Sequence, residues 1–327
     1  MYKLDTSVFT ISLDLELMWG VFDKRNINNY GTNIDNVKEV VPKILNLFLE
    51  YNINATWAIV GCLNFLSLED LLDNIPKTLP RYNNQKLSAY SHMQKIKKQN
   101  FSKYYSAVKL ISMIKSRKTQ EIATHTFSHY YCLEDPINDV SFKEDIVKAI
   151  SVSNNIGIET KSIIFPRNQY YDECFRICME EGIIAYRGNE NNFLQRPRNQ
   201  NELNLLIRAL RFADSYINIT GFNIYDKLYK NSNGLVNIPS SFFFRPYARN
   251  KILEYCKIKR YKSAMLSAAK NQKLFHLWWH PHNFGKNMDK NLFQLKEILD
   301  YYSLLNKKYE MKSMNMSQLA SKVINNQ

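Results

Sequence analysis

The chain of 327 residues lacks several features that would narrow its class. It has no internal repeat, no low-complexity linker and no apolar run near the roughly 18 residues that a membrane-spanning helix needs. Its five cysteines have no spacing that combines them with other metal ligands, so we expect reduced thiols. No basic head followed by an apolar run and a cleavage site stands at the N-terminus, which favours a cytoplasmic protein. We expect a single domain over residues 1–327.

Motifs of nucleic-acid-binding proteins are also missing, although the formal net charge is +14. No helix-turn-helix, RNA-recognition motif or zinc finger can be found, so we expect no nucleic-acid partner. Excess lysine and arginine instead raise the local concentration of other anions, such as diphosphates and acidic headgroups. The densest run of these residues, 251–273, is equally typical of a solvated helix face.

A period of two near the N-terminus predicts a β-strand. Apolar residues alternate with polar ones over residues 8–16, so Asp14 and Glu16 project from the same face. Two carboxylates that close repel each other, and one is driven towards its neutral form unless a cation lies beside them. A bound metal resolves this, because one carboxylate ligates and the other remains free as a base. The alternative is an ordinary acidic strand end that leads into a loop.

Two histidines four residues apart follow the apolar stretch 121–124. His125 and His129 can face the same point if the segment turns helically from its first residue. Proteins hold divalent metals in this way, but the spacing also arises by chance near helix starts. The pair therefore needs further ligands of the right chemistry to indicate a metal site.

A third candidate follows the dense apolar run 274–279. Pro281 cannot donate to a sheet ladder, so the predicted strand ends close to His280. The end of a strand is where barrel enzymes keep their acids and bases. His276, inside the run, is better explained as a core residue, and His282 as a hydrogen-bonded loop residue.

The order of these pieces resembles the polysaccharide deacetylase family, also called the NodB-homology or carbohydrate esterase 4 domain. The most specific signature is His-Thr-Phe-Ser-His at 125–129, and residues 54–61 are similar to the family's second strand. The resemblance runs with gaps from about residue 7 to about residue 285. It implies an α/β fold, a deformed (β/α) barrel, with a mainly helical insertion over residues 66–118 at the mouth of the site. A polar loop is expected at 189–204.

The resemblance also implies roles for the candidate residues. Glu16, His125 and His129 would ligate a divalent metal, most simply Zn²⁺, leaving a position for water and the acyl oxygen. Asp14 would take the proton of the attacking water, and His280 would protonate the departing amine or alcohol. The family's acidic pair is adjacent, whereas one residue separates the two carboxylates here. Which of them is the base and which is the ligand stays open.

Three further residues are candidates for substrate binding. Arg167 lies in the counterpart of the family's Arg-x-Pro segment, whose arginine orients the base, but here it follows the proline. Trp279 or its neighbour Trp278 could line the acyl pocket, and both could equally belong to the sheet core. Arg245 ends an apolar run and could present its guanidinium to a phosphate or carboxylate of the substrate, or pair with a structural carboxylate.

Together these features predict a metal-dependent hydrolase that removes an N- or O-acyl group, such as acetyl, from a sugar in cell-surface polysaccharide or glycolipid biosynthesis. In the cytoplasm the acylated sugar would be linked to a nucleotide or to a lipid carrier. The excess cations would allow peripheral contact with the inner membrane surface. Alternatives are a hydrolase of cyclic amides, similar to allantoinase, and a non-catalytic carbohydrate-binding member of the fold. Loops decide which sugar and which acyl group are recognised.

Overall fold

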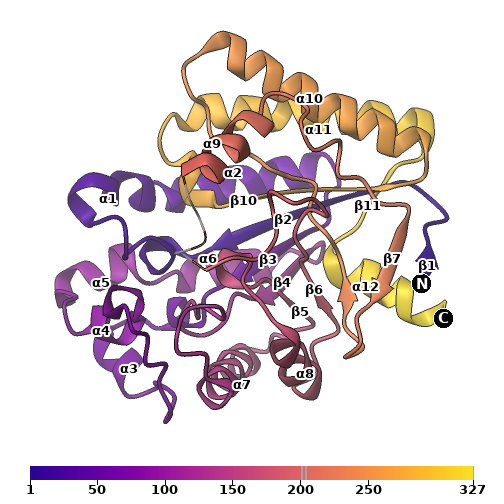
Figure 1. Cartoon of the computed structure of the whole chain (residues 1–327). Helices are drawn as coiled ribbons and strands as arrows, with labels where there is room; N and C mark the ends of the chain where they lie inside the picture. Colours follow the sequence, from indigo (N-terminus) through magenta and orange to yellow (C-terminus); the bar gives the residue numbers. More distant parts are fainter. Residues whose placement is uncertain (200–201, 203–204, 327) are drawn as a thin grey trace.

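A computed structural model describes residues 1–199, 202 and 205–326 (Figure 1). Its strands are β1 (Tyr2–Lys3), β2 (Val8–Leu15), β3 (Ala55–Ile59), β4 (Gln120–Thr124), β5 (Ser162–Ile163), β6 (Ala185–Tyr186), β7 (Lys227–Lys230), β8 (Val236–Asn237), β9 (Phe242–Phe243), β10 (Leu274–Trp279) and β11 (Lys312–Ser313). The sheet order is β1-β7-β8-β6-β5-β4-β3-β2-β10-β9, and β11 pairs with β2. The strands from β8 to β9 in this order pair in parallel, whereas β7 and β1 are antiparallel additions.

One extended segment, residues 236–243, closes the parallel strands into a barrel. β8 pairs with β6, and β9, which follows it in the chain, pairs with β10. Between them the N–H of Ser240 donates to the carbonyl of Gly188, whereas the N–H of Ser241 donates to the carbonyl of His276. The segment thus joins the two edges of the parallel sheet. The predicted deformed (β/α) barrel is confirmed.

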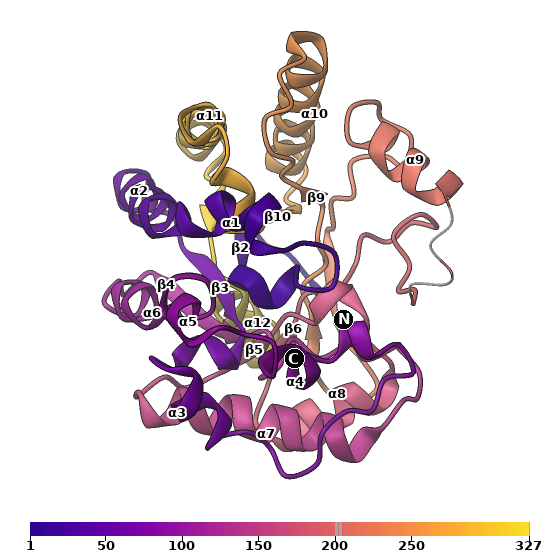
Figure 2. The ribbon, with the colours of Figure 1, turned by 90° about the vertical axis from the view of Figure 1, so that its left-hand side faces the viewer.

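Helices surround the strands in the view of Figure 2. They are α1 (Ile27–Asp35), α2 (Val37–Glu50), α3 (Leu68–Leu72), α4 (Ala89–Met93), α5 (Lys98–Tyr104), α6 (Val108–Lys115), α7 (Asp139–Asn155), α8 (Asp172–Glu180), α9 (Leu205–Asp214), α10 (Lys251–Lys270), α11 (Met288–Tyr309) and α12 (Met316–Asn325). Within the described part of the chain, no helix has both the length and the apolar character required to cross a membrane. The cysteines are free thiols.

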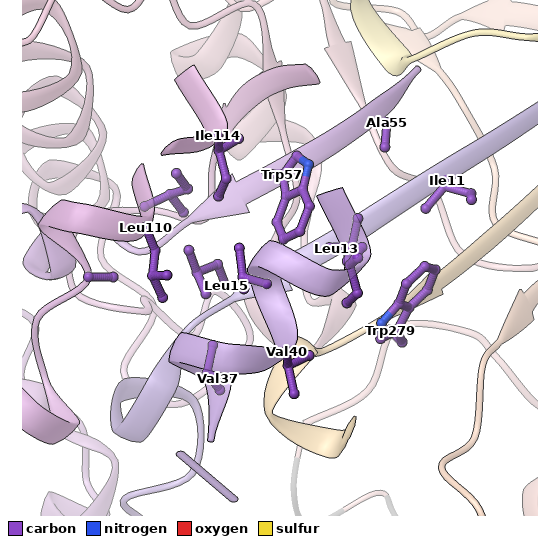
Figure 3. Close-up of a cluster of buried hydrophobic side chains, with 14 of the residues drawn as sticks. Ile11, Leu13, Leu15, Val37, Val40, Ala55, Trp57, Leu110, Ile114 and Trp279 are labelled. Carbon is purple, nitrogen blue, oxygen red and sulfur yellow. The ribbon is translucent and has the colours of Figure 1, made fainter. Parts of the chain in front are cut away.

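Side chains alternate between the two faces of β2, so one face packs in the outer core and the other faces the interior of the barrel. Ile11, Leu13 and Leu15 point outwards and pack in one buried cluster with α2, as Figure 3 shows beside Val37 and Val40. The polar side chains of the same strand project from the opposite face. Burial of the outer face stabilises the sheet by about 25 cal/mol for each Å² of apolar surface. The strand predicted near the N-terminus is therefore confirmed, and its polar face is directed into the barrel.

Helix α12 packs against the amino-terminal ends of the strands. Met316, Leu319, Ala320 and Val323 of this helix are buried in one apolar cluster. The cluster also contains residues from the strands and the segments that extend them: Val8, Ala58, Ala123, Ile164, Ala185, Val236, Ile238 and Leu274. An apolar layer therefore lies under α12, and beside it the Glu121 carboxylate accepts hydrogen bonds from the Thr56 and Ser162 hydroxyls and from Ser317 N.

The segment 66–118 contains α3 to α6 and the loops between them, as the sequence predicted in part. No described residue of this segment lines the cavity at the carboxyl ends of the strands, and its predicted place over the mouth of the site stays a prediction. His92 stacks on Phe22 with ring centroids 4.6 Å apart. The indole Nε1 of Trp19 donates to the carbonyl of Tyr105 at 2.9 Å. The segment supports the loop that follows β2.

The predicted loop at 189–204 has neither helix nor strand in its described part, residues 189–199 and 202. Residues 200, 201, 203 and 204 lie outside the described residues. The loop leads to α9, which stands at the periphery of the molecule, apart from the strands, in Figure 2.

Candidate metal centre

The carboxyl ends of the strands bring five of the predicted site residues together. Asp14 lies near the end of β2 and Glu16 directly follows it, while His125 follows β4 and His280 follows β10. Because the strands are parallel, the residues that follow them meet at one end of the barrel. The Oε1 atom of Glu16 lies 3.4 Å from His125 Nε2, 3.5 Å from His129 Nε2 and 3.0 Å from His280 Nε2.

Glu16, His125 and His129 have the geometry of three ligands of one metal ion. Two donors that each lie about 2.0–2.2 Å from a tetrahedral zinc are roughly 3.3–3.6 Å apart. The carboxylate-to-imidazole distances of 3.4 and 3.5 Å agree with this separation. The Nε2 atoms of both imidazoles are buried and have no hydrogen-bond partner, which is costly for a polar atom. The donor set and the unpartnered nitrogens therefore fit a divalent metal.

The two histidines converge through a loop, and the predicted helical turn is wrong. Thr126 and His129 have φ angles of 63° and 58°, in the left-handed region. The carboxylate of Asp145 on α7 accepts hydrogen bonds from Phe127 N at 2.6 Å, Ser128 N at 3.1 Å and the Ser128 hydroxyl. Because Asp145 satisfies these N–H groups, the segment needs no helical hydrogen bonds. Asp145 was not found from the sequence, where it is an ordinary acidic residue in a polar helix.

A hydrogen bond fixes the orientation of His125, and an aromatic contact supports His129. His125 Nδ1 lies 2.7 Å from the carbonyl oxygen of Ile164, to which it donates. This bond leaves the lone pair on Nε2, which is directed at Glu16. The ring of Tyr131 stands perpendicular to that of His129, with centroids 5.1 Å apart. The N–H of Tyr131 in turn donates to the hydroxyl of Tyr82 at 2.9 Å.

Arg187 holds Asp14 in a bidentate ion pair. Its Nη1 lies 2.7 Å from Asp14 Oδ1 and its Nη2 lies 2.8 Å from Oδ2, and both side chains are buried. Burial alone would raise the pKa of Asp14, but the Arg187 guanidinium, with smaller effects of His125 and His280, holds this pKa below its usual value. The guanidinium also lies 4.1 Å from the ring centroid of Trp278. Asp14 is therefore ionised and fixed in orientation.

The sequence reasoning missed Arg187. This residue follows the apolar run 183–186, which ends in β6, just as His280 follows the apolar run of β10. A charged residue directly after a short apolar run was thus the available signal. Arg167 lines the same cavity but pairs with Asp23, and its guanidinium lies 4.0 Å from the ring centroid of Tyr131.

The prediction that Trp279 contacts the substrate is wrong. Its side chain has no exposed surface and stacks on Phe284, with centroids 5.6 Å apart. Figure 3 shows it in the outer core beside Leu13. Side chains alternate along a strand, so the neighbouring Trp278 has the opposite direction and lines the cavity.

Arg245 lies outside the cavity above the metal-ligand candidates. It lines a neighbouring hollow of about 130 Å³. Its guanidinium donates to the hydroxyl of Ser215 and lies 5.3 Å from the ring centroid of Phe212 on α9. Its contact with substrate stays a prediction.

His280 is placed to carry a proton. Burial acts to lower its pKa, but the carboxylates of Glu16 and Asp14 outweigh burial and raise this pKa above its usual value. Its Nε2 lies 3.7 Å from Asp14 Oδ2. His276, by contrast, is a core residue as predicted: its Nε2 lies 2.8 Å from the hydroxyl of Ser12, and burial lowers its pKa to about 3.

A cavity of about 470 Å³ opens above these groups and is lined by Asp14, Glu16, His129 and His280. Its volume lies within the usual range for small-molecule sites, roughly 300–1,000 Å³. A hollow of about 510 Å³ between α10 and α11 contains none of the predicted site residues. The arrangement of candidate metal ligands, an ionised carboxylate and a histidine with a raised pKa at a cavity floor can perform metal-assisted hydrolysis.

Solved structures share this fold, whereas no family model and no curated protein matches the sequence. A protein from Mycobacterium smegmatis described as a polysaccharide deacetylase has a TM-score of 0.63 at 12% identity, over 100% of this chain and 93% of the other. The Puue allantoinase has a TM-score of 0.54 at 12% identity, over 96% and 90%. A protein from Pseudomonas aeruginosa described as a polysaccharide deacetylase has a TM-score of 0.50 at 10% identity, over 90% and 85%. The chain thus has the polysaccharide deacetylase fold, which agrees with the resemblance in its sequence.

Proposed function

We propose that the protein is a metal-dependent deacylase that removes an N- or O-acyl group, such as acetyl, from a sugar. The observation that carries this proposal is the convergence of Glu16, His125 and His129 on one point at the floor of a cavity, beside Asp14 and His280. Three protein ligands and a free coordination position are typical of catalytic zinc sites. The fold shared with polysaccharide deacetylases supports the same class of reaction.

Glu16, His125 and His129 would hold the ion, with Zn²⁺ as the simplest choice. When bound, a divalent metal polarises the acyl oxygen and lowers the pKa of water. The distances favour Glu16 over Asp14 as the carboxylate ligand. Oε1 of Glu16 lies within 3.5 Å of both imidazoles, whereas both oxygens of Asp14 already accept hydrogen bonds from Arg187.

The remaining groups move protons. Asp14 accepts the proton of the attacking water at a carboxylate oxygen, and Arg187 keeps this carboxylate ionised and oriented. His280 then gives a proton from Nε2 to the departing nitrogen or oxygen, since the carboxylates of Glu16 and Asp14 raise its pKa and so favour its protonated form in the free protein. General acid and base help of this kind accelerates a reaction by roughly 10²–10⁴ for each group.

The substrate in this proposal is a nucleotide- or lipid-linked acylated sugar of cell-surface polysaccharide or glycolipid biosynthesis, met in the cytoplasm or at the inner membrane surface. The net charge of +14 supports an anionic substrate or surface.

The test is acyl release by the metal-loaded protein from a panel of acylated nucleotide sugars and lipid-linked sugars, with acetate and formate measured. We expect a stoichiometric divalent metal in elemental analysis, and loss of both metal and release in His125→Ala. His92→Gln, which changes a histidine outside the cavity, is the matched control.

Two results would contradict this proposal. A protein without metal whose ligand binding is unchanged in His125→Ala would be a non-catalytic binder. Hydrolysis of allantoin or a cyclic imide, with no release from acylated sugars, would identify a cyclic-amide hydrolase.

A further inference from the structure

One side of the cavity is lined by cationic side chains from three separate segments. They come from the loop after β2, the loop after β6, and α9, and we call them the basic arm: Lys24, Arg25, Arg196, Arg198, Arg208 and Arg211. The acidic residues that line the same cavity, Asp14 and Glu16, lie at the metal centre. The floor of the cavity therefore carries acidic as well as basic side chains, whereas one wall is strongly positive.

Protein carboxylates compensate the charge of the basic arm only in part: Asp23 and Glu134 act on Lys24, and Glu190 acts on Arg211. In the described part of the chain, none of its side chains forms an ion pair with Asp or Glu, whereas Arg187 is paired with Asp14. Arg198 Nη1 and Arg211 Nε both donate to the carbonyl of Leu194, at 2.8 Å each. These bonds to a neutral acceptor position two guanidiniums without pairing either of them with a carboxylate.

The cations are crowded as well as unpaired. Burial and the nearby charges of Arg167 and Arg208 lower the pKa of Lys24, and together they outweigh the opposing carboxylates of Asp23 and Glu134. Burial and the charge of Arg198 likewise lower the pKa of Arg211 against the opposing effect of Glu190. Like charges held together in this way repel each other, and a bound anion relieves the repulsion.

We propose that the basic arm binds a phosphate or diphosphate ester of the substrate while the acyl group lies at the metal centre. This inference rests on the proposed function, and it assigns the anion to one wall of the cavity. Five of the six side chains are arginines, whose planar guanidinium matches phosphate oxygens in bidentate pairs. Because the basic arm and the metal centre line one cavity, a single substrate reaches both.

The exposed surface beside the basic arm favours a lipid carrier over a nucleotide as the source of this phosphate. Phe193, Leu205 and Leu206, in the loop after β6 and at the start of α9, are 57%, 82% and 67% exposed. Apolar side chains beside arginines on a peripheral helix are typical of elements that lie on an anionic membrane surface. Helix α9 occupies such a peripheral position in Figure 2.

The first test is calorimetric titration of the full chain with inorganic pyrophosphate before metal is added, so that the anion cannot bind to the ion. We expect binding that weakens roughly tenfold to hundredfold per arginine removed. Arg196→Gln with Arg208→Gln is the suitable variant, because both side chains are exposed. Lys98→Gln with Arg176→Gln removes the same charge from exposed positions on α5 and α8. No binding by the wild type, or equal binding by the two variants, overturns the proposal.

The second test distinguishes the sources of the phosphate. We expect the wild type to sediment with phosphatidylcholine vesicles that contain phosphatidic acid and not with phosphatidylcholine alone, and the Arg196→Gln, Arg208→Gln variant to lose this binding. Tight binding of uridine diphosphate without vesicle binding would overturn the lipid assignment and identify a nucleotide.

Measurements of acyl release and of pyrophosphate binding together distinguish failure of this inference from failure of the proposed function. Pyrophosphate binding through the basic arm, with no acyl release from any sugar, would contradict the proposed deacylase activity and support the anion site. Acyl release from a neutral acylated sugar, with no pyrophosphate binding, would support the deacylase activity and contradict the anion site.

Discussion

The two ends of the barrel differ in the balance of apolar and charged side chains that they bury. At the amino end, α12 contributes Leu319 and Val323 to an apolar cluster. At the carboxyl end, Asp14, Arg187 and His129 are buried with at most 3% of their surface exposed. Burying apolar groups stabilises a fold, whereas burying charges costs free energy unless each is paired. One end therefore supplies stability, and the other uses part of it to hold reactive groups in place.

The largest effect that tests this contrast is expected from His129→Ala. Loss of one of three ligands should remove the metal and reduce acyl release by at least roughly a thousandfold, since the metal supplies several kcal/mol of transition-state stabilisation. Stability of the metal-free protein should change little, because His129 has buried nitrogens without hydrogen-bond partners. Elemental analysis, acetate release and urea unfolding check the three statements. Retained metal and activity would show that His129 is not a ligand.

The next effect concerns the buried ion pair. Arg187→Met leaves the Asp14 carboxylate buried without a partner, so we expect a loss of about 3–5 kcal/mol in the free energy of unfolding. Adding Asp14→Asn should recover much of this loss while activity remains absent. Urea unfolding of both variants provides the measurement. A loss no larger than that of Arg176→Gln would mean that the pair does not organise this end of the barrel.

A smaller effect is expected at the amino end. Leu319→Ala creates a cavity under α12 and should lower the free energy of unfolding by about 2–3 kcal/mol, within the range for such changes. Metal content and acyl release per folded molecule should stay at the wild-type level. A large fall in the activity of the folded fraction would contradict the division of roles between the two ends.

The smallest effect is a pH dependence from His92, which supports the loop after β2. Burial lowers its pKa from 6.5 to about 4, so the unfolded chain binds this proton at a higher pH than the folded chain. Its stabilising contribution is complete above pH 6.5 and declines as the pH falls towards 4, by at most about 1.4 kcal/mol per pH unit. His92→Gln should therefore flatten the loss of stability between pH 7 and pH 5 in urea unfolding. An unchanged slope would show that His92 titrates normally in the folded protein.

Most of the barrel and the core of the site could be predicted because their signals are local. Periodicity marked β2, an apolar run followed by Pro281 marked β10, and Asp14, Glu16 and His280 lie at the ends of these strands. Their meeting point then follows from parallel pairing. The conformation of the loop at 125–129 was not predictable, because Asp145 determines it from a separate helix.

The surface on which cationic side chains gather was harder to predict from the sequence. The sequence drew attention to residues 251–273, yet Lys257 is buried against Glu254 and Arg260 against Asp214. The basic arm has no dense run in the sequence, because its members come from three segments that only the fold brings together. Local density of charge in the sequence thus did not indicate the cations that line the cavity.

The segment that closes the barrel links two parts of the proposed reaction. Ser240 and Ser241 are consecutive, yet they bond to the strand extension that carries Arg187 and to the strand that ends at His280. The rigid geometry of one peptide unit therefore sets the spacing between the residue that orients the base and the residue that supplies the acid. Loops at the mouth of the cavity can change the substrate without altering this spacing. Substrate specificity can therefore change in evolution while the geometry of proton transfer is kept.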